Sequence, residues 1–322
     1  MSRKKRIGRP NFKSKRSRQS YSLSYQKFKL NQESSTIRLE KIGHVPIVLD
    51  RRIPDNADYR SVTVSKTPSG KFFVSILTKV NVELLPSTGR MVGIDVGLSD
   101  LFNFSNGDKV NNPRWFRESQ SRLARAQRHL SRKKKGSNRY EKQRKKVARC
   151  HEEIANQRSY FLHNMSMSLV RSYDVICVED LNIAGLVKNS QLAKSISDAG
   201  WAMFINMLEY KSRWYGRSFV KIDRFFPSSQ TCSSCGHKDG KKQLSIREWE
   251  CSQCGASHDR DVNAANNILI KGFSDLTGLP FEEASAESVD YRRGEDVRLF
   301  DASHHLAASV KRQENTNQPA MG

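Results

Sequence analysis

The chain has 322 residues, with 56 Lys and Arg against 33 Asp and Glu, a formal net charge of +23 and a pI near 9.9. No stretch approaches the ~20 apolar residues of a membrane span, and no apolar segment follows the basic start, residues 1–6, so we expect neither a membrane span nor a secretory signal. A chain of this length predicts a sizeable core and roughly two domains.

The positive charge is concentrated in two segments. Residues 1–18 hold nine Lys and Arg and no acid, and residues 115–149 hold fourteen against two glutamates. A charge run is usually only a solvated face, but an excess this large and of one sign predicts a polyanionic partner, held through phosphate contacts. Nucleic acid is therefore the expected partner, and an anionic membrane surface is the weaker alternative. We expect a soluble, cytoplasmic protein in a reducing compartment.

The front of the chain predicts a basic segment followed by a small β module. Residues 1–40 are polar and weakly periodic, so we expect them to be partly disordered or ordered only on nucleic acid. Within residues 41–88, alternation with period two at 59–66 and 71–80 predicts a hairpin around the turn Thr67–Gly70. This pattern suits a small barrel-like module.

Residues 89–230 combine apolar strand patterns with helical ones, which is typical of an α/β domain. The first strand pattern carries Asp95, and a later one ends in Glu179 and Asp180. A carboxylate inside an apolar strand is expensive to desolvate without a cation or strong hydrogen bonds, although a lone one is more often structural. Because successive strand side chains alternate faces, only one of the last two acids can face a given site, and we choose Glu179.

Between these two strand patterns, residues 114–172 predict two basic helical arms separated by a break at Lys133–Asn138. The arms are expected to hold a phosphate backbone, while the apolar stripe of the second arm is expected to be core. After a polar loop at Lys188–Asp198, residues 201–210 predict a helix and residues 218–223 a further strand.

Two CxxC pairs, fifteen residues apart, define the segment 231–256. The four cysteines are Cys232, Cys235, Cys251 and Cys254. Four thiolates at this spacing are typical of a zinc ribbon, and because they leave no open coordination position, we predict a structural Zn²⁺. Two disulfides and a redox-active CxxC are the alternatives, and both are disfavoured by the lack of a secretory signal or a thioredoxin-like unit. The remaining Cys150 and Cys177 are expected to be ordinary helix and strand residues.

Residues 257–274 predict a final helix, which Asp259 can cap, with Asp261 in its first turn. Alone, Asp261 is an ordinary acid at a helix start. Together with Asp95 and Glu179 it completes three acids from separate elements, which is how hard oxygen ligands for Mg²⁺ are assembled. Two Mg²⁺ ions held there would activate a water and stabilise the leaving oxygen in phosphodiester cleavage.

The ordered motifs resemble the TnpB (OrfB) family of insertion-sequence proteins, relatives of the type V CRISPR effectors. The resemblance covers roughly residues 8–272 and rests on four stretches: Gly93–Gly97, Val178–Asn182, Asp223–Cys232 and His258–Ala265. It implies an RNase H-like (RuvC) nuclease domain with a long helical insertion and an inserted zinc ribbon, preceded by the small β module. It also implies that Asp95, Glu179 and Asp261 are the catalytic Mg²⁺ ligands.

The resemblance further implies an RNA-guided, Mg²⁺-dependent DNA endonuclease encoded by a transposon, with a guide RNA derived from the transposon end. Base pairing and not side chains would then read the target. Such proteins are often named transposases, but the acids do not argue for strand transfer. A catalytically idle nucleic-acid-binding relic or repressor and an unguided RuvC-like nuclease are the alternatives.

Both ends of the chain carry further expectations. The stretch Arg9–Lys15 resembles an internal part of the family pattern, so we expect the front of the wedge and recognition region to be missing. Residues 275–322 are polar, and we expect them to be a disordered tail. When bound to DNA, the protein is expected to associate with a prokaryotic nucleoid.

Overall fold

The computed structural model describes residues 17, 19–243 and 245–285, and the chain divides into two compact units. The first unit takes in the chain up to Asn81 together with Ser121–Glu153; the second takes in Val82–Gln120 and the chain from Ile154 onward. The predictions for the basic start and for the front of the family pattern concern residues 1–16, which lie outside the described residues. In the described part of the chain, no helix combines the length and apolarity needed to cross a membrane.

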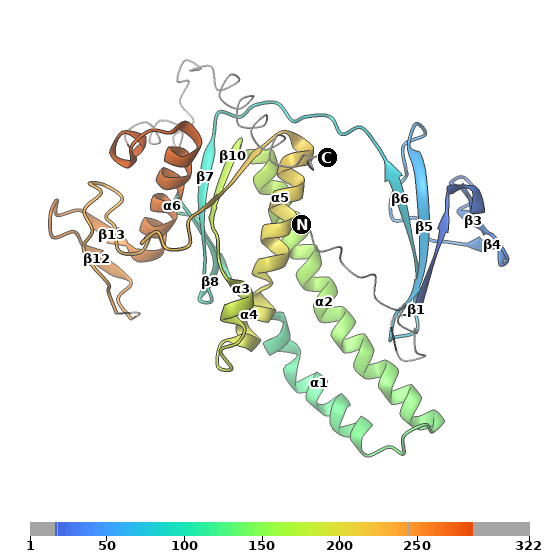
Figure 1. The fold of residues 1–322 in the computed structure, drawn as a ribbon. Coiled ribbons are helices and arrows are strands. Elements are labelled where there is room, and N and C mark those ends of the chain that lie inside the picture. The colour runs from blue at the N-terminus through green and yellow to red at the C-terminus, as the bar shows by residue number, and fades with distance from the viewer. Residues whose placement is uncertain (1–16, 18, 244, 286–322) are drawn as a thin grey trace, which may run out of the picture. The chain divides into compact units, whose positions relative to one another are not determined.

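Two three-stranded antiparallel sheets make up most of the first unit (Figure 1). Their orders are β1-β5-β6 and β2-β3-β4. Both sheets contribute to one small core centred on the buried side chains of Ile37, Leu39 and Val62. The bounds are β1 Gln19–Ser24, β2 Phe28–Asn31, β3 Thr36–Leu39, β4 Gly43–Pro46, β5 Asp58–Lys66 and β6 Phe72–Lys79, with a 3-10 turn, η1, at Tyr25–Lys27.

The predicted hairpin is confirmed as β5 and β6, and Gly70 closes its turn by donating its N–H to the carbonyl of Thr67. The β structure nevertheless begins earlier than predicted. Strands β1, β2 and β3 lie within residues 1–40, so the expectation that these residues are partly disordered or ordered only on nucleic acid is wrong for residues 19–39. These strands are only four to six residues long, so each shows the alternation of polar and apolar residues over a short stretch.

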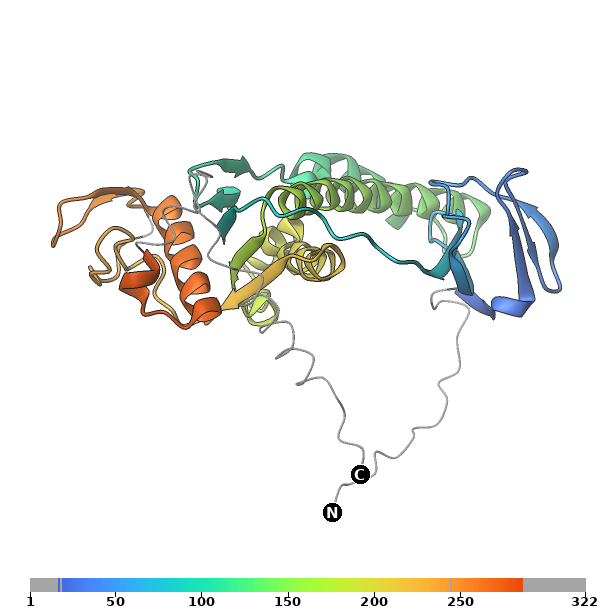
Figure 2. The same ribbon diagram turned by 90° about the horizontal axis from the view of Figure 1, so that it is seen from above.

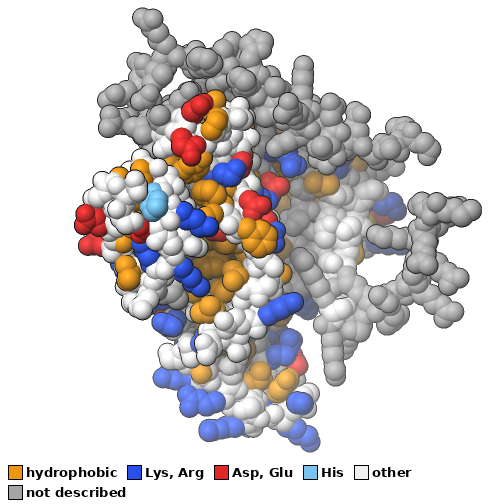
Figure 3. Space-filling model, turned by 60° about the vertical axis from the view of Figure 1, so that its left-hand side comes forward, with side chains coloured by type: hydrophobic (Ala, Val, Ile, Leu, Met, Phe, Trp, Pro, Cys, Tyr) orange, Lys and Arg blue, Asp and Glu red, His pale blue; other side chains and the backbone are white. Residues whose placement is uncertain are grey.

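Helices α1 (Trp115–Ser131) and α2 (Asn138–Ser172) confirm the two predicted basic arms and the break between them. Lys and Arg side chains gather at the lower end of Figure 3, the level at which α1 and α2 meet in Figure 1. The apolar stripe of α2 is core, as expected. Its buried residues are Ile154, Leu162, Ser166, Leu169 and Val170.

The second unit is built on a five-stranded sheet of order β11-β10-β7-β8-β9. Strands β7, β10 and β11 are parallel, whereas β8 runs antiparallel to both of its neighbours. The strand bounds are β7 Met91–Val96, β8 Asp100–Phe104, β9 Lys109–Asn111, β10 Val175–Glu179 and β11 Ser218–Ile222. The remaining elements are α3 Ile183–Leu186, α4 Ala193–Ala199, α5 Trp201–Tyr215, α6 Arg260–Thr277, and a two-stranded sheet of β12 Glu248–Glu250 and β13 Ser257–Asp259.

Helices cover both faces of this sheet, with α6 on one side and α5 and the end of α2 on the other (Figures 1 and 2). Along each strand, successive side chains point alternately to the two helical layers that cover the sheet. Val92 and Ile94 of β7 pack in the core with α2 and α5, whereas Met91 packs in the core with α6. The mixed α/β architecture expected from the sequence is therefore confirmed.

The segment Leu85–Gly89, which joins the β module to β7, is held by a buried ion pair. Arg217 Nη1 lies 2.7 Å from Asp174 Oδ1, and the same guanidinium donates to the carbonyls of Leu85 and Pro86. Asp174 also accepts the backbone N–H groups of Thr88 and Gly89. These contacts fix the point at which the chain enters β7.

Two sequence expectations need correction. The polar loop at Lys188–Asp198 contains helix α4, whose buried Asp198 accepts the N–H of Phe116 and pairs with Arg158 at 2.7 Å. The disordered tail predicted from residue 275 is wrong for residues 275–285, because α6 runs to Thr277 and a helical stretch at 281–285 buries Ala284 against α6. Residues 286–322 lie outside the described part.

Candidate active site and metal centre

Two of the three predicted acids lie side by side at the carboxyl ends of neighbouring parallel strands. Ile94 of β7 pairs with Val178 of β10, so Asp95 and Glu179 are the next residues along the two strands. Both side chains are half-buried. The crossover through α1 and α2 thus brings together two carboxylates that are 84 positions apart in the chain.

Both carboxylates belong to the face of the sheet that α6 covers. Cys177, two residues before Glu179, is buried in the core with α6, and Gly93 stands two residues before Asp95. A Cβ atom at Gly93 would lie 2.1 Å from the carbonyl oxygen of Ala265 in α6. Only glycine lets the helix backbone approach β7 this closely.

The third acid, Asp261, lies in the first turn of α6, one helical turn before its contact with β7. Asp259 caps the helix, because its Oδ1 accepts the N–H groups of Asp261 at 3.1 Å and Val262 at 3.0 Å. Lys109 Nζ of β9 pairs with Asp259 Oδ2 at 2.6 Å. The predicted cap and the predicted position of Asp261 are both confirmed.

Two of the acids, Asp95 and Glu179, have raised pKa values, and burial is the main cause for both. Burial, followed by the negative charges of Asp261 and Glu179, raises the pKa of Asp95 from 3.8 to about 8. Burial and the neighbouring Asp180 raise the pKa of Glu179 from 4.5 to about 7. A divalent cation among these carboxylates would compensate both burial and repulsion, so the donor set fits a hard metal such as Mg²⁺.

Asn103 is a site residue that the sequence reasoning missed. It lies opposite Asp95 on the antiparallel strand β8, it is buried, and its hydrogen bond to the Asp95 carboxylate acts to lower the pKa of that acid. Its Oδ1 has no hydrogen-bond partner among the described residues. A buried amide within the apolar run Leu101–Phe104 was the available signal, because such a group needs a partner.

Arginines contact two acids of this region. Arg247, just before β12, donates from Nη1 to Asp261 Oδ2 at 3.0 Å and from Nη2 to Ser99 Oγ at 3.2 Å. Arg224 pairs with Asp180. Asp180 and Asp261 are thus each paired with an arginine.

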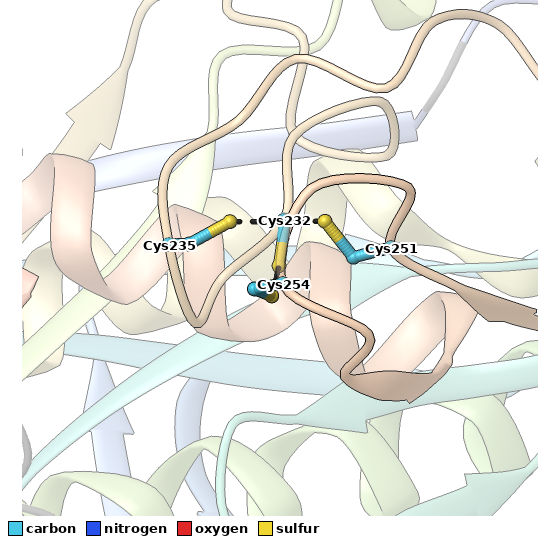
Figure 4. Close-up of side chains that lie close together, drawn as sticks. All are labelled: Cys232, Cys235, Cys251 and Cys254. Carbon is cyan, nitrogen blue, oxygen red and sulfur yellow. Dashed lines mark hydrogen bonds between the residues drawn. The ribbon is translucent and has the colours of Figure 1, made fainter.

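The four predicted cysteines come together (Figure 4), and their ligating atoms all lie within 4.8 Å of one another. The Sγ atoms of Cys232 and Cys254 are 3.7 Å apart, and so are those of Cys235 and Cys251. All four are free thiols, so the disulfide alternative is not realised. In the described part of the chain, no other set of three or more His, Cys, Asp or Glu side chains lies this close together. The four thiols could hold a metal ion such as zinc.

Two equivalent tight turns carry the thiols. The N–H of Gly236 bonds to the carbonyl of Cys232, and the N–H of Gly255 bonds to that of Cys251. Both glycines have a positive φ, 75° and 70°, which an L side chain adopts only with strain. His258 Nε2 of β13 lies 3.0 Å from Cys232 Sγ, a contact that the sequence reasoning did not identify.

Helix α6 connects the thiol cluster to the acids. Asn263, two residues after Asp261, accepts the N–H of Ser233 at 2.9 Å and donates to the carbonyl of Thr231 at 2.8 Å. Asn267, one turn later, donates to the same carbonyl at 2.6 Å. The helix that carries Asp261 therefore also holds the backbone of the first cysteine turn.

The fold and this site define a basic α/β protein with a four-cysteine cluster that could hold a metal. Comparison with known families then gives the particular family. The chain belongs to the OrfB_IS605 family, described as "Probable transposase", whose model matches residues 75–190. The "Cas12f1-like, TNB domain" matches residues 201–268. The resemblance to TnpB (OrfB) proteins predicted from the motifs is confirmed.

The relatives carry consistent names. A "Putative RNA-guided DNA endonuclease" of Streptomyces pristinaespiralis is 44% identical over 271 residues, which cover 84% of this chain and 67% of the relative. The "Putative RNA-guided DNA endonuclease InsQ" of Escherichia coli K12 is 33% identical over 310 residues, covering 89% and 76%. A cryo-EM structure of the Cas12f1–sgRNA–target DNA complex aligns with a TM-score of 0.48 at 17% identity, over 66% of this chain and 46% of that one.

Proposed function

We propose that this protein is an RNA-guided, Mg²⁺-dependent DNA endonuclease of the RuvC type, encoded by a transposon. The names of its relatives support RNA guidance and DNA cleavage. The sheet supports the nuclease type, because three consecutive antiparallel strands, β7-β8-β9, are followed by β10 and β11 on the other side of β7, with helices on both faces. That strand order agrees with the RNase H-like fold that the resemblance to the TnpB family implies.

The observation that supports the proposal is that Asp95 and Glu179 lie at the ends of neighbouring parallel strands, with the negative charge of Asp261 on α6 acting on Asp95. Each acid has an ordinary explanation when taken alone. Burial is the main cause of the raised pKa of Asp95, and the negative charges of Asp261 and Glu179 add to it, so a cation bound there would lower the cost of ionising Asp95. A chain with 23 excess positive charges has no structural need for such a cluster.

In the proposed mechanism the three carboxylates hold Mg²⁺, and Asn103 orients Asp95. When bound, the metal supplies an activated water and stabilises the leaving 3′ oxygen of the scissile phosphodiester. The carboxylates must be ionised to bind it. The basic arms α1 and α2 bind phosphates of the nucleic acid.

The thiol cluster belongs to this proposal as a structural zinc ribbon spanning residues 231–256. With a Zn–S bond of about 2.3 Å, a regular tetrahedron has a sulfur–sulfur edge of about 3.8 Å. The two 3.7 Å separations agree with that edge. Four thiolates leave no position for substrate, so the metal stabilises the ribbon and, through Asn263, the start of α6.

The test is to co-express the protein with the DNA that flanks its gene, sequence the RNA that copurifies, and assay Mg²⁺-dependent cleavage of a matching DNA. Glu179→Gln should abolish cleavage. Asp180→Asn is the matched control, because it alters the adjacent acid on the opposite face of the strand, and it should retain most of the activity.

The other outcomes separate the alternatives. Specific RNA without cleavage by the wild-type protein would favour a catalytically idle binding protein. Cleavage that needs no RNA would favour an unguided nuclease. Equal activity of the two variants would contradict the assignment of Glu179.

A further inference from the structure

A polar pocket of about 210 Å³ lies in the second unit, between the turn from β7 to β8, the first turn of α1 and helix α4. Its cationic side chains are those of Arg114, Arg117 and Lys194, and its hydroxyl and amide groups come from Ser99, Asn112 and Ser195. None of these residues belongs to the three acids or to the thiol cluster. The roles proposed for those two sites therefore leave the pocket unexplained.

The charge of the pocket is positive. Asp198 is the one acid in its lining, and it pairs at 2.7 Å with Arg158, a cation from outside the lining. Among the described residues, no carboxylate forms an ion pair with any of the three cations of the pocket. Lys194 instead donates to the neutral Oε1 of Gln120 at 2.7 Å. Three cations without an acid of their own attract an anion.

The walls of the pocket are held by contacts between distant parts of the chain. Asp198 accepts the backbone N–H of Phe116 at 3.0 Å, which ties α4 to the first turn of α1 (Figure 1). Asn112 donates to the carbonyl of Leu98 at 3.1 Å and accepts the N–H of Arg114 at 3.1 Å. A charge run on a solvated helix face has no such frame, whereas these cations converge on one fixed cavity.

The pocket lies at the edge of the sheet where the predicted metal ligands lie. Ser99 follows Asp95 by four residues in the chain, at the end of β7. Arg247 donates to Ser99 Oγ at 3.2 Å and to Asp261 Oδ2 at 3.0 Å. One guanidinium thus spans the distance from the pocket to the third acid. An anion in the pocket would be a near neighbour of a phosphate held at the acids.

The lining selects phosphate over a nucleobase. Guanidinium, ammonium, hydroxyl and amide groups are the donors that bind phosphate oxygens in protein–DNA complexes. The one aromatic ring in the lining is Phe116, and Lys194 Nζ lies 4.9 Å from its centroid, so a cation already covers the face on which a base would stack. The expected contact is therefore independent of base sequence.

We propose that this pocket binds a backbone phosphate of the DNA strand that the nuclease cuts, at a linkage close to the scissile bond. The phosphate oxygens accept hydrogen bonds from Arg114, Arg117 and Lys194, and this contact fixes the register of the strand at the acids. The three side chains bind the substrate and supply no group to the reaction. The inference rests on the proposed function, because a strand bound at the acids brings further phosphates beside the scissile one.

The first experiment is lysine footprinting of the full-length protein, freed of copurified RNA at high salt and kept in Mg²⁺-free buffer without chelator. An acetylating reagent modifies exposed lysines with and without a single-stranded oligothymidylate, and mass spectrometry quantifies each site. Lys194 should react several-fold more slowly with the oligomer bound. Lys188, which is also exposed but lies outside the lining, should react as before.

Arg117→Gln and Arg213→Gln form the matched pair. Both arginines are exposed and both substitutions remove one charge, but only Arg117 lines the pocket. Arg117→Gln should therefore remove the protection of Lys194, and Arg213→Gln should leave it unchanged. Equal protection of Lys194 and Lys188, or protection that is equally strong in the two variants, would overturn the inference. Protection of Lys194 by millimolar inorganic phosphate as strong as by the oligomer would assign the pocket to a free anion and overturn the commitment to a strand.

The second experiment locates the phosphate on the strand. The copurified protein–RNA complex is given matching DNAs that each carry one uncharged methylphosphonate linkage, and both target affinity and cutting are measured. One such linkage, close to the cut, should weaken binding or cutting by wild type roughly 10-fold, the effect of losing one charge-assisted contact. The same linkage should have no further effect in Lys194→Gln. A scan in which no linkage near the cut is coupled to Lys194 would contradict the proposal.

The two experiments separate this inference from the proposed function. Footprinting needs no cleavage, so protection of Lys194 in a protein that does not cut DNA refutes only the proposed nuclease. Guided cleavage by a protein whose Lys194 is never protected refutes only the phosphate pocket.

Discussion

Replacing Asp95 by Asn should stabilise the metal-free protein at alkaline pH while abolishing its nuclease activity. The pKa of Asp95 is about 8 in the folded protein against an ordinary 3.8, because the carboxylate is buried beside Asp261 and Glu179. Asparagine has the same shape, carries no charge and can still accept the hydrogen bond from Asn103. Its amide can also donate to the Asn103 oxygen that has no partner among the described residues.

The sign of the pH dependence follows from the raised pKa. The folded wild-type protein binds a proton at Asp95 more tightly than the unfolded chain does, so this stabilisation is fully present below about pH 4 and is lost as the pH rises to about 8. The asparagine variant does not titrate there. Its stability relative to wild type should therefore increase from pH 5 to pH 8.

The size of this change in the free energy of unfolding follows from the same pKa. A tenfold change in a dissociation constant is worth about 1.4 kcal/mol, so titration from pH 5 to pH 8 is worth at most roughly 4 kcal/mol. Because the Asp95 side chain is half-buried and its surroundings can relax, we expect roughly 2 kcal/mol.

The assay is urea unfolding of both proteins at several pH values in Mg²⁺-free buffer, repeated with Mg²⁺. Without Mg²⁺, the difference between the two proteins in the free energy of unfolding should increase with pH. When Mg²⁺ is added, this difference should shrink or reverse, because the cation binds wild type more tightly. A gap that is independent of pH, or an Asp95→Asn variant less stable than wild type at pH 8, would refute the reasoning.

Three further predictions concern the contacts around α6 and the basic arms. Gly93→Ala places a Cβ 2.1 Å from the Ala265 carbonyl oxygen, so it should displace α6, cost at least about 1–3 kcal/mol in urea unfolding and lower cleavage. Asn263→Ala removes two hydrogen bonds to the first cysteine turn, so purified protein should retain less zinc by elemental analysis, and a zinc content equal to that of wild type would contradict this role. Nucleic-acid affinity should fall steeply with salt, and a flat response would contradict the phosphate contacts.

Local sequence patterns were sufficient for much of the candidate site. Strand alternation predicts Glu179 and not Asp180 for the acid site, and this choice stays a prediction, because Asp180 and Asp261 both pair with arginines. The CxxC spacing predicted the thiol cluster, since each pair forms a short turn closed by a glycine. The helix cap at Asp259 could also be predicted from the sequence, because a cap involves only neighbouring residues.

The remaining features depend on contacts between residues distant in sequence. Arg247 reaches Ser99 across 148 positions, and Asn103 meets Asp95 only because β7 and β8 pair in one register. Strands β1 to β3 were missed because their small core is completed by residues of β5 and β6. The helical stretch at 281–285 was likewise hidden, since its one fully buried apolar residue, Ala284, packs against α6.

The most direct measurement of the central claim is Mg²⁺-dependent cleavage of a matching DNA by the copurified protein–RNA complex, compared among wild type and single Asn or Gln variants of Asp95, Glu179 and Asp261. Each variant should bind the same RNA and DNA as wild type and fail to cut. Cleavage at the wild-type rate by any one of the three would contradict a shared carboxylate site for Mg²⁺.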